Sequence, residues 1–296
     1  MKKLVYLAQW FFRARFLGRR APLQTVLFIS DRCNLQCKHC SVYNKHNPHN
    51  MTYEQVREHL LYSYSLGSRF VDFEGGETMI WRDGDRNIND LIDLAKEVGF
   101  FSATITTNAQ LPFAGCRADS IWVSLDGTGA YHEAVRGKGT FARLEANIAS
   151  AAHKHLSVNM VVNTLNYTDV DNTIEYAAAN PNIESISINF HTPFPGTEYL
   201  MVDKKTRDGI IDRIIDYKRR GYPIMNSVSG LKLMKRGDFK RRCWVTNFIY
   251  PDGSRGLCIG DGTPICRDCG FCMSGEMASL FSFKPDTVLA GLKLRV

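Results

Sequence analysis

Hydrophobic runs and amphipathic segments alternate along the chain after residue 22. Apolar, β-branched or aromatic runs occupy 24–30, 69–73, 101–106, 121–125, 157–163 and 183–190. Between most of them, apolar residues recur at steps of three and four, which predicts helices with one buried face. Six such strand–helix units predict an α/β protein with a parallel sheet and right-handed crossovers. The pattern alone leaves open whether the sheet is open and doubly wound or forms an incomplete barrel.

Two of the predicted helices carry boundary signals. Thr52 and Gln55 have the spacing of a capping box, and Gly67 ends the segment that they begin. A second helix is predicted over 206–220, because isoleucines recur on one face and Gly221 follows.

The N-terminal segment is basic and amphipathic. Its apolar side chains are Leu4, Val5, Leu7, Trp10, Phe11 and Phe12, and its basic ones are Lys2, Lys3, Arg13, Arg15, Arg19 and Arg20. No small-residue cleavage site follows the apolar stretch, so we do not expect a secretory signal. This composition is typical of a helix lying in a membrane interface, and also of a helix packed on the main domain. Both alternatives stay open at this point.

Composition narrows the classes of protein and partner. A chain of 296 residues that is 44% hydrophobic can bury one large domain with a small appendage, and no apolar run is long enough to span a bilayer. The net charge of +7 suits anionic small molecules or a membrane surface and falls short of a nucleic-acid footprint. Eight of the nine cysteines lie in two clusters, which predicts metal-binding thiols in a reducing cytoplasm. If the N-terminal helix lies in a membrane interface, we expect peripheral contact at the inner membrane face.

Polar or glycine-rich motifs follow every predicted strand. In parallel α/β folds the chemistry belongs at the carboxyl ends of the strands, so we expect one site there. These motifs are Cys33–Cys40, Glu74–Thr78, Thr106–Gln110, Ser124–Gly127, Asn163 and the FHTPFPG stretch at 190–196.

The first motif contains Cys33, Cys37 and Cys40, with gaps of three and two residues. Three thiolates suit a [4Fe–4S] cube whose fourth iron stays free for another ligand. A catalytic metal site likewise keeps one coordination position open. The alternative is a zinc ion held by the three cysteines and one of the nearby histidines, which are His39, His46 and His49.

Cys-x3-Cys-x2-Cys after the first strand and Gly-Gly-Glu after the second resemble the radical S-adenosylmethionine (SAM) superfamily, over roughly residues 24–225. The resemblance implies a partial (β/α)6 barrel of the TIM type. It also implies that Cys33, Cys37 and Cys40 hold a [4Fe–4S] cluster that cleaves SAM reductively. The 5′-deoxyadenosyl radical would then attack an organic substrate. An electron donor such as flavodoxin or ferredoxin is implied as well.

The resemblance further implies SAM contacts at the strand ends. His39 would lie beside the adenine, and Gly75, Gly76 and Glu77 would receive the SAM amino group, although Thr78 stands where the family often has proline. The other implied contacts are Thr107, Asn108, Ser124, Asp126, Arg136 and Asn163, among which Arg136 resembles an arginine that pairs with the SAM carboxylate. Structural alternatives exist for three of them: a turn at Asp126, a strand-end cap at Asn163 and a solvated charge at Arg136.

The second cysteine cluster lies in the C-terminal segment. The PDG sequence predicts a hairpin turn that brings Cys243 and Cys258 together, and Cys266, Cys269 and Cys272 follow at two-residue gaps. This arrangement resembles the SPASM/twitch extension of radical SAM enzymes. It implies a single auxiliary [4Fe–4S] cluster on four of the five thiols, with zinc as the alternative.

The expected organisation is an N-terminal helix at 1–22, a barrel at 23–225 and a small auxiliary-cluster domain at 226–296. This layout looks most like the adenosylhopane-synthase-like branch, which implies a lipid or isoprenoid substrate. The alternatives are a twitch-type dehydrogenase of a small alcohol or sugar, a peptide maturase, and a non-enzymatic iron–sulfur or zinc protein used for sensing or scaffolding. Cys116 stands apart, either as a buried apolar residue or as a hydrogen-atom donor to a product radical.

Overall fold

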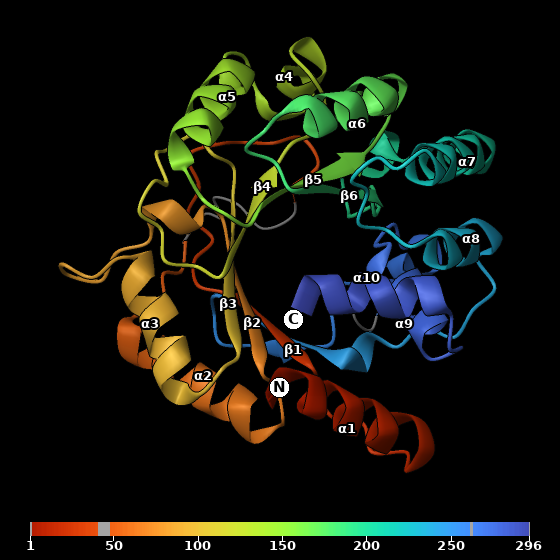
Figure 1. Cartoon of the computed structure of the whole chain (residues 1–296). Coiled ribbons are helices and arrows are strands. Elements are labelled where there is room, and N and C mark those ends of the chain that lie inside the picture. Colours follow the sequence, from red (N-terminus) through yellow and green to blue (C-terminus); the bar gives the residue numbers. More distant parts are fainter. Residues whose placement is uncertain (1, 41–47, 261–262, 296) are drawn as a thin grey trace.

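The computed structural model describes residues 2–40, 48–260 and 263–295 and contains one curved sheet ringed by helices (Figure 1). The strand order is β6-β5-β4-β3-β2-β1-β7-β8, and every neighbouring pair is parallel except the last. The strands are β1 (Gln24–Phe28), β2 (Phe70–Glu74), β3 (Ser102–Thr107), β4 (Ser120–Ser124), β5 (Leu156–Val162), β6 (Ser185–Phe190), β7 (Thr246–Ile249) and β8 (Arg255–Gly256).

Helices cover the outer face of the sheet, while α8, α9 and α10 pack together beside the open edge at β6 (Figure 1). The helices are α1 (Lys2–Phe16), α2 (Tyr53–Ser65), α3 (Ile88–Val98), α4 (Ala130–Arg136), α5 (Thr140–Ala151), α6 (Val170–Ala179), α7 (Lys204–Arg219), α8 (Val228–Arg236), α9 (Met273–Leu280) and α10 (Pro285–Arg295). The protein is therefore an α/β partial barrel, as the resemblance predicted.

The six predicted strands are confirmed, each within two residues of its expected bounds. The capping box at Thr52 and Gln55 is also confirmed. The helix predicted over 206–220 is confirmed as α7, which begins earlier, at Lys204, because Asp203 caps it by accepting the Thr206 N–H. One pairing was not predicted: β7 lies parallel to β1 and extends the barrel sheet.

The two faces of the sheet differ sharply in polarity. Side chains that point outward toward the helices, such as Val71, Ile105 and Val158, are fully buried in one apolar core. The register places the alternate positions of neighbouring strands on the opposite, interior face. Most of them are polar on β2 to β6: Asp72, Glu74, Thr104, Thr106, Ser124, Ser157, Asn159, Ser187 and Asn189. TIM-type interiors are normally filled with branched apolar residues, so this interior is built differently.

An aromatic group covers the other wall of the interior. Phe28 on β1 stacks against Phe248 on β7 and against Tyr250, with ring centroids 6.1 and 5.8 Å apart. The interior therefore has one aromatic wall and one polar wall.

Helix α1 packs on the domain through one face. Trp10 is only 6% exposed, contacts Trp244 and Phe281, and donates from Nε1 to the Ala21 carbonyl oxygen at 2.8 Å. Of the two alternatives for the N-terminal helix, packing on the main domain is therefore confirmed for the face that contains Trp10. On the opposite face, Phe12 and Phe16 are 54% and 57% exposed. Within the part of the chain that the structure describes, no helix is long and apolar enough to cross a membrane.

Candidate functional site

The loop that carries the first three cysteines lies directly against the loop after β2. Gly76 N–H donates to the Ser30 carbonyl at 2.7 Å, and Glu77 N–H donates to the Arg32 carbonyl at 2.8 Å. A Cβ atom on Gly76 would lie 1.9 Å from the Arg32 carbonyl oxygen, a distance that no side chain can occupy. The glycine therefore permits the two loops to meet, and this contact fixes the position of the cysteine loop.

Glu77 joins the β2 loop to the end of β3. Its carboxylate accepts hydrogen bonds from Met79 N–H at 3.0 Å, Thr107 Oγ1 at 2.7 Å and Asn108 N–H at 2.7 Å. Burial raises the pKa of Glu77, and these three hydrogen bonds oppose that rise. Glu77 and Thr107 thus brace the strand ends from inside, and their contact with the SAM amino group stays a prediction.

Two of the three thiols, those of Cys33 and Cys37, lie near groups that donate toward sulfur. Leu35 N–H lies 3.4 Å from Cys33 Sγ, Asn108 Nδ2 lies 3.7 Å from the same sulfur, and Arg136 Nη1 lies 3.8 Å from Cys37 Sγ. Burial raises the pKa of Cys33 to about 11 and also raises that of Cys37, so neither thiol ionises readily by itself. Donors of this kind stabilise sulfur that carries negative charge, which fits thiolates bound to iron.

The histidines of the zinc alternative are engaged elsewhere or lie outside the described residues. His39 Nε2 lies 3.6 Å from Asp126 Oδ2, and His49 Nδ1 lies 3.5 Å from Asp31 Oδ2. His46 falls outside the described residues. No three of the described Cys, His, Asp and Glu side chains are close enough together to hold a single metal ion.

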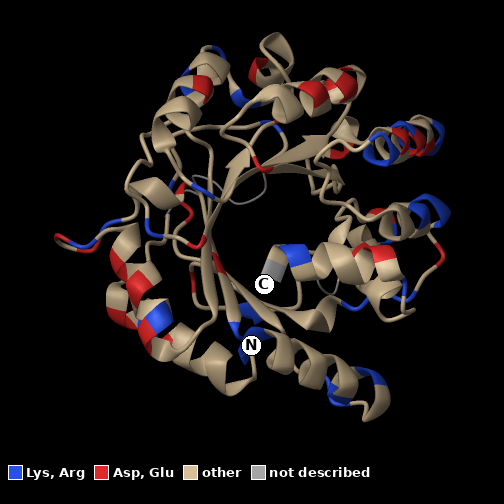
Figure 2. Cartoon of the chain, in the orientation of Figure 1, with Lys and Arg blue, Asp and Glu red and all other residues tan. Residues whose placement is uncertain are grey.

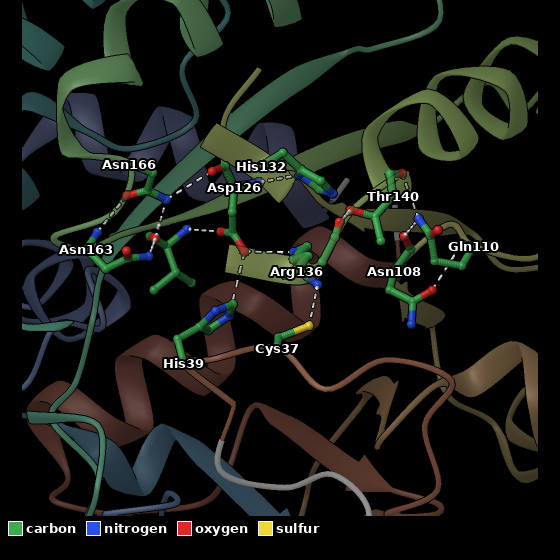
Figure 3. A network of polar contacts seen from close by, with 12 residues as sticks. Cys37, His39, Asn108, Gln110, Asp126, His132, Arg136, Thr140, Asn163 and Asn166 are labelled. Atoms are coloured by element: carbon green, nitrogen blue, oxygen red, sulfur yellow. Dashed lines mark hydrogen bonds and ion pairs between the residues drawn. The ribbon is translucent and has the colours of Figure 1, made fainter. Parts of the chain in front are cut away.

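Asp126 is the centre of a buried polar network at the end of β4 (Figure 3). One oxygen accepts from Arg136 Nε at 2.7 Å, and the other accepts from Val161 N–H at 2.8 Å. Burial alone would raise the pKa of Asp126, but the charge of Arg136, with His39 and the Val161 hydrogen bond, lowers it below its usual value. Asp126 is therefore a buried carboxylate that fixes Arg136 beside Cys37.

Two members of this network were missed by sequence reasoning. His132 Nδ1 accepts from Asp126 N–H at 3.2 Å, and Asn166 Nδ2 donates to the Asp126 carbonyl at 3.0 Å. Burial lowers the pKa of His132 to about 3, so the ring is neutral and can accept. The available signal was their spacing: His132 lies on the helix that follows Asp126, and Asn166 is three residues after Asn163.

The other predicted SAM contacts differ in accessibility. Asn163 is fully buried, donates to the Val161 carbonyl at 3.0 Å and accepts from Leu165 N–H at 2.9 Å, as expected of a strand-end cap. Ser124 ends β4 on the interior face and keeps partial exposure. Burial lowers the pKa of His39 to about 4, and its Nδ1 is buried with no hydrogen-bond partner among the described residues. Of these three residues, His39 and Ser124 keep a polar atom or an exposed surface that a ligand could contact, and their roles stay predictions.

The predicted C-terminal hairpin is confirmed. Strands β7 and β8 are antiparallel, and the thiols of Cys243 and Cys258 form a hydrogen bond that raises the pKa of Cys258. The charges of Cys243 and Cys266 act on both Cys258 and Cys269, so these four thiols gather in one place.

Cys272 is the fifth thiol of the C-terminal segment. It is buried at the start of α9, where its N–H donates to Asn189 Oδ1 at 2.8 Å and where burial raises its pKa to about 12, with a further contribution from the nearby Cys269. Four thiols equal the ligand number of one auxiliary metal centre. As described, they do not lie close enough together to hold a metal ion, so the auxiliary centre and its ligand set stay predictions.

Cys116 packs on the helical layer. The residues on either side of it, Gly115 and Arg117, are hydrogen bonded to Asn89 at the start of α3, and Cys116 itself packs against the apolar core. Burial raises the pKa of Cys116. Its position favours the packing role over that of a hydrogen-atom donor at the strand ends.

Comparisons with known proteins agree with this geometry. The chain is 24% identical over 281 residues to a GTP 3′,8-cyclase of Clostridium botulinum, covering 87% of this chain and 78% of that relative. Its fold is similar to that of Streptococcus suis SuiB bound to S-adenosylmethionine, with a TM-score of 0.64, 18% identity, and coverage of 88% of this chain and 65% of that chain. It is also similar to anSMEcpe with bound AdoMet, with a TM-score of 0.60, 16% identity, and coverage of 80% of this chain and 74% of that chain.

These solved structures establish the fold. The family itself is shown by a family model described as the Radical SAM superfamily, which matches residues 27–177 and includes the three cysteines and the Gly-Gly-Glu motif. That match covers just over half of the chain, on the strands and loops that build the site described above. The chain therefore belongs to the radical SAM superfamily.

Proposed function

We propose that this enzyme uses a 5′-deoxyadenosyl radical, formed at the strand ends, to modify a polar, water-soluble substrate held inside the partial barrel. Membership of the superfamily already makes it an enzyme that uses a [4Fe–4S] cluster and SAM. We infer the polar character of the substrate from the polar interior wall formed by β2 to β6. The adenosylhopane-like interpretation, with its lipid or isoprenoid substrate, receives no support from this wall.

The protein residues around the cofactors have distinct tasks. When bound, the cluster supplies the electron that cleaves SAM reductively. Cys33, Cys37 and Cys40 would hold three of its irons, while Asn108 and Arg136 donate toward the sulfurs of Cys33 and Cys37. Asp126 holds Arg136 in place, as described above, and the guanidinium would receive the SAM carboxylate in the role that the resemblance implies.

The interior polar groups favour a substrate that forms hydrogen bonds. Asn189 donates to Asn159 at 2.8 Å, and the hydroxyls of Ser157 and Ser185 lie 2.9 Å apart. Several of these groups, including Glu74, keep partial exposure inside the barrel. Covering them with an acyl or isoprenoid chain would cost about 1–3 kcal/mol for each group left without a partner. A polar ligand avoids that cost.

Glu74 adds a titratable group to the interior wall. Burial, together with the nearby Asp72 carboxylate, raises the pKa of Glu74 to about 7. Glu74 is therefore partly protonated near neutral pH and can both donate and accept a hydrogen bond. Such a group suits an amine, a hydroxyl or an amide of a substrate better than a hydrocarbon.

Isotope transfer tests this substrate class. The reduced, reconstituted enzyme is incubated with SAM and with extracts of its native cells grown in deuterated medium, separated into lipid, small-molecule and peptide fractions. Because the radical takes a hydrogen atom from its substrate, we expect deuterium in 5′-deoxyadenosine with a water-soluble fraction only. The Cys37→Ala variant is the matched control. Deuterium transfer from the lipid fraction alone would contradict the proposal.

A peptide substrate is the second candidate, because of one structural likeness. S. suis SuiB bound to the precursor peptide SuiA has a fold similar to this chain, with a TM-score of 0.64 at 16% identity and coverage of 91% of this chain and 67% of that chain. A peptide backbone also matches the hydrogen-bonding groups of the interior. The peptide fraction of the isotope experiment separates this candidate from a small alcohol or sugar.

Peripheral membrane contact is proposed separately, through the outer face of α1. The first 22 residues contain six basic residues and no acidic one, so they contribute +6 to the net charge of +7. Figure 2 shows basic residues at the C-terminal end of α1. Exposed Phe12 and Phe16 lie in the same region as exposed Phe283, and Arg15 sits 5.5 Å from the Phe16 and Phe283 ring centroids. Apolar rings among arginines suit an anionic lipid surface.

Vesicle flotation tests this contact. We expect the wild type to bind anionic vesicles in a salt-sensitive manner, and Phe12→Ser with Phe16→Ser to reduce binding at least about tenfold, since a buried aromatic ring contributes roughly 1.5–3 kcal/mol. The control is Leu61→Ser with Leu66→Ser, which removes two exposed apolar side chains from the α2 end of the domain. Equal binding by both double variants would contradict the assignment.

A further inference from the structure

A cavity of about 230 Å³ lies outside the proposed cofactor site, between the end of β6, the start of α7, the end of α8 and the C-terminal cysteine segment. Helices α7 and α8 lie side by side here (Figure 1). We propose that this cavity binds the oxyanion group, a carboxylate or a phosphate, of a small organic ligand. The residues that carry the proposal are Arg207, Arg241 and Arg267, all of which line the cavity.

The three arginines lack carboxylate partners among the described residues, unlike the lysines beside them. Lys204 pairs with Asp208 and Lys235 pairs with Asp212, each at 2.6 Å, whereas none of the three arginines forms an ion pair there. Of the carboxylates that line the cavity, Asp208 is neutralised in this way and Asp203 is used to cap α7. Asp268 is the one other carboxylate in the described lining, so the cavity keeps an excess of positive charge.

Two of these guanidinium groups contain an unsatisfied donor. Nε of Arg207 and Nε of Arg241 are buried and have no hydrogen-bond partner in the described part of the chain. A buried donor without a partner destabilises the protein. An oxyanion in the cavity would accept from both groups and remove that destabilisation.

Aromatic rings fix the planes of both guanidinium groups. Arg207 lies 5.2 Å from the Phe190 ring centroid and also donates to the Met234 carbonyl at 3.4 Å, while Arg241 lies 5.4 Å from the Phe239 ring centroid. Arginines held in this way lose little entropy when they bind, and their forked donors match the geometry of carboxylate and phosphate.

The cavity adjoins the C-terminal cysteine segment and the end of β6. Its lining includes Cys269, one of the four gathered thiols, and His191, which follows β6. A ligand anchored here by an oxyanion would reach from the C-terminal cysteines toward the strand ends. The oxyanion proposal holds whether the C-terminal thiols carry iron or zinc, and it does not require the substrate class proposed above.

The test is a binding titration of the full-length, reconstituted protein with three probes: inorganic phosphate, pyrophosphate and succinate. Isothermal titration calorimetry is performed on the wild type, Arg207→Gln, Arg241→Gln and the control Arg213→Gln. Arg213 lies on α7 as well but is exposed and pairs with Asp171. We expect saturable wild-type binding of at least one probe, a loss of affinity of about tenfold or more in the first two variants, and no change in the control. Preference for the phosphates or for succinate identifies which oxyanion the cavity takes.

Two outcomes would overturn the proposal. One is the absence of saturable binding of all three probes to the wild type. The other is unchanged affinity in both arginine variants, which would mean that Arg207 and Arg241 serve only to balance the charge of the nearby thiolates. Iron content and 5′-deoxyadenosine formation are measured on the same samples. A failure of the radical SAM chemistry is thereby recognised separately from a failure of the oxyanion site.

Discussion

Replacing Cys37 by alanine is expected to abolish reductive cleavage of SAM while leaving the fold intact. Cys37 belongs to a loop at the carboxyl end of β1, whereas the apolar core is formed by the outward faces of the strands and by the helices. Removing one thiol takes away one of three iron ligands and leaves Arg136 without its sulfur neighbour. We therefore expect 5′-deoxyadenosine formation at background level, with a circular dichroism spectrum like that of the wild type.

Cys116→Ala is the matched control for this variant. It also removes one partly buried thiol, but from the helical layer next to α3, away from both cysteine groups. SAM cleavage by Cys116→Ala should match the wild type. Full SAM cleavage by Cys37→Ala would contradict the assignment of the cluster. Loss of the modified product in Cys116→Ala, with SAM cleavage retained, would support the role of Cys116 as a hydrogen-atom donor.

Replacing Cys258 by alanine is expected to halve the iron content. Two four-iron clusters give about eight irons per wild-type chain. Cys258 is hydrogen bonded to Cys243 and lies among the four gathered thiols, so its loss should remove the auxiliary cluster and leave about four irons. The fold of the barrel should persist, because β7 is held by β1 as well as by the hairpin.

Cys272→Ala distinguishes the ligand set. Cys272 is buried at the start of α9 and packs against the apolar core, so we expect this variant to keep about eight irons. Loss of half the iron in Cys272→Ala, with full iron content in Cys258→Ala, would mean that Cys272 is an auxiliary ligand and Cys258 is not. A wild-type content of about four irons and one zinc would mean that the C-terminal thiols hold zinc and not an auxiliary iron–sulfur cluster.

The strands of the barrel were predictable because each is a local run of apolar residues. The pairing of β7 with β1 was not, since it joins Gln24 to Thr246, more than two hundred residues apart. The four-residue strand TNFI contains no signal of its partner. The hairpin after it was predictable, because the PDG turn is local in sequence.

The cysteines and glycines of the site were predictable because each motif consists of characteristic residue types a few positions apart in the sequence. The groups that position them were not. His132 and Asn166 act by hydrogen bonds to the main chain of Asp126, and several polar residue types can accept or donate such a bond. The N-terminal helix is a second example. Its amphipathic spacing predicted a helix with apolar side chains but did not indicate that the face with Trp10 packs on the domain.

The most direct test of the account is formation of 5′-deoxyadenosine and methionine from SAM by the purified, anaerobically reconstituted chain. We expect both products in equal amounts after reduction with dithionite, and neither product without reductant. A chain that contains about four or more irons and binds SAM, yet forms neither product when reduced, would contradict the claim that this site performs radical SAM chemistry.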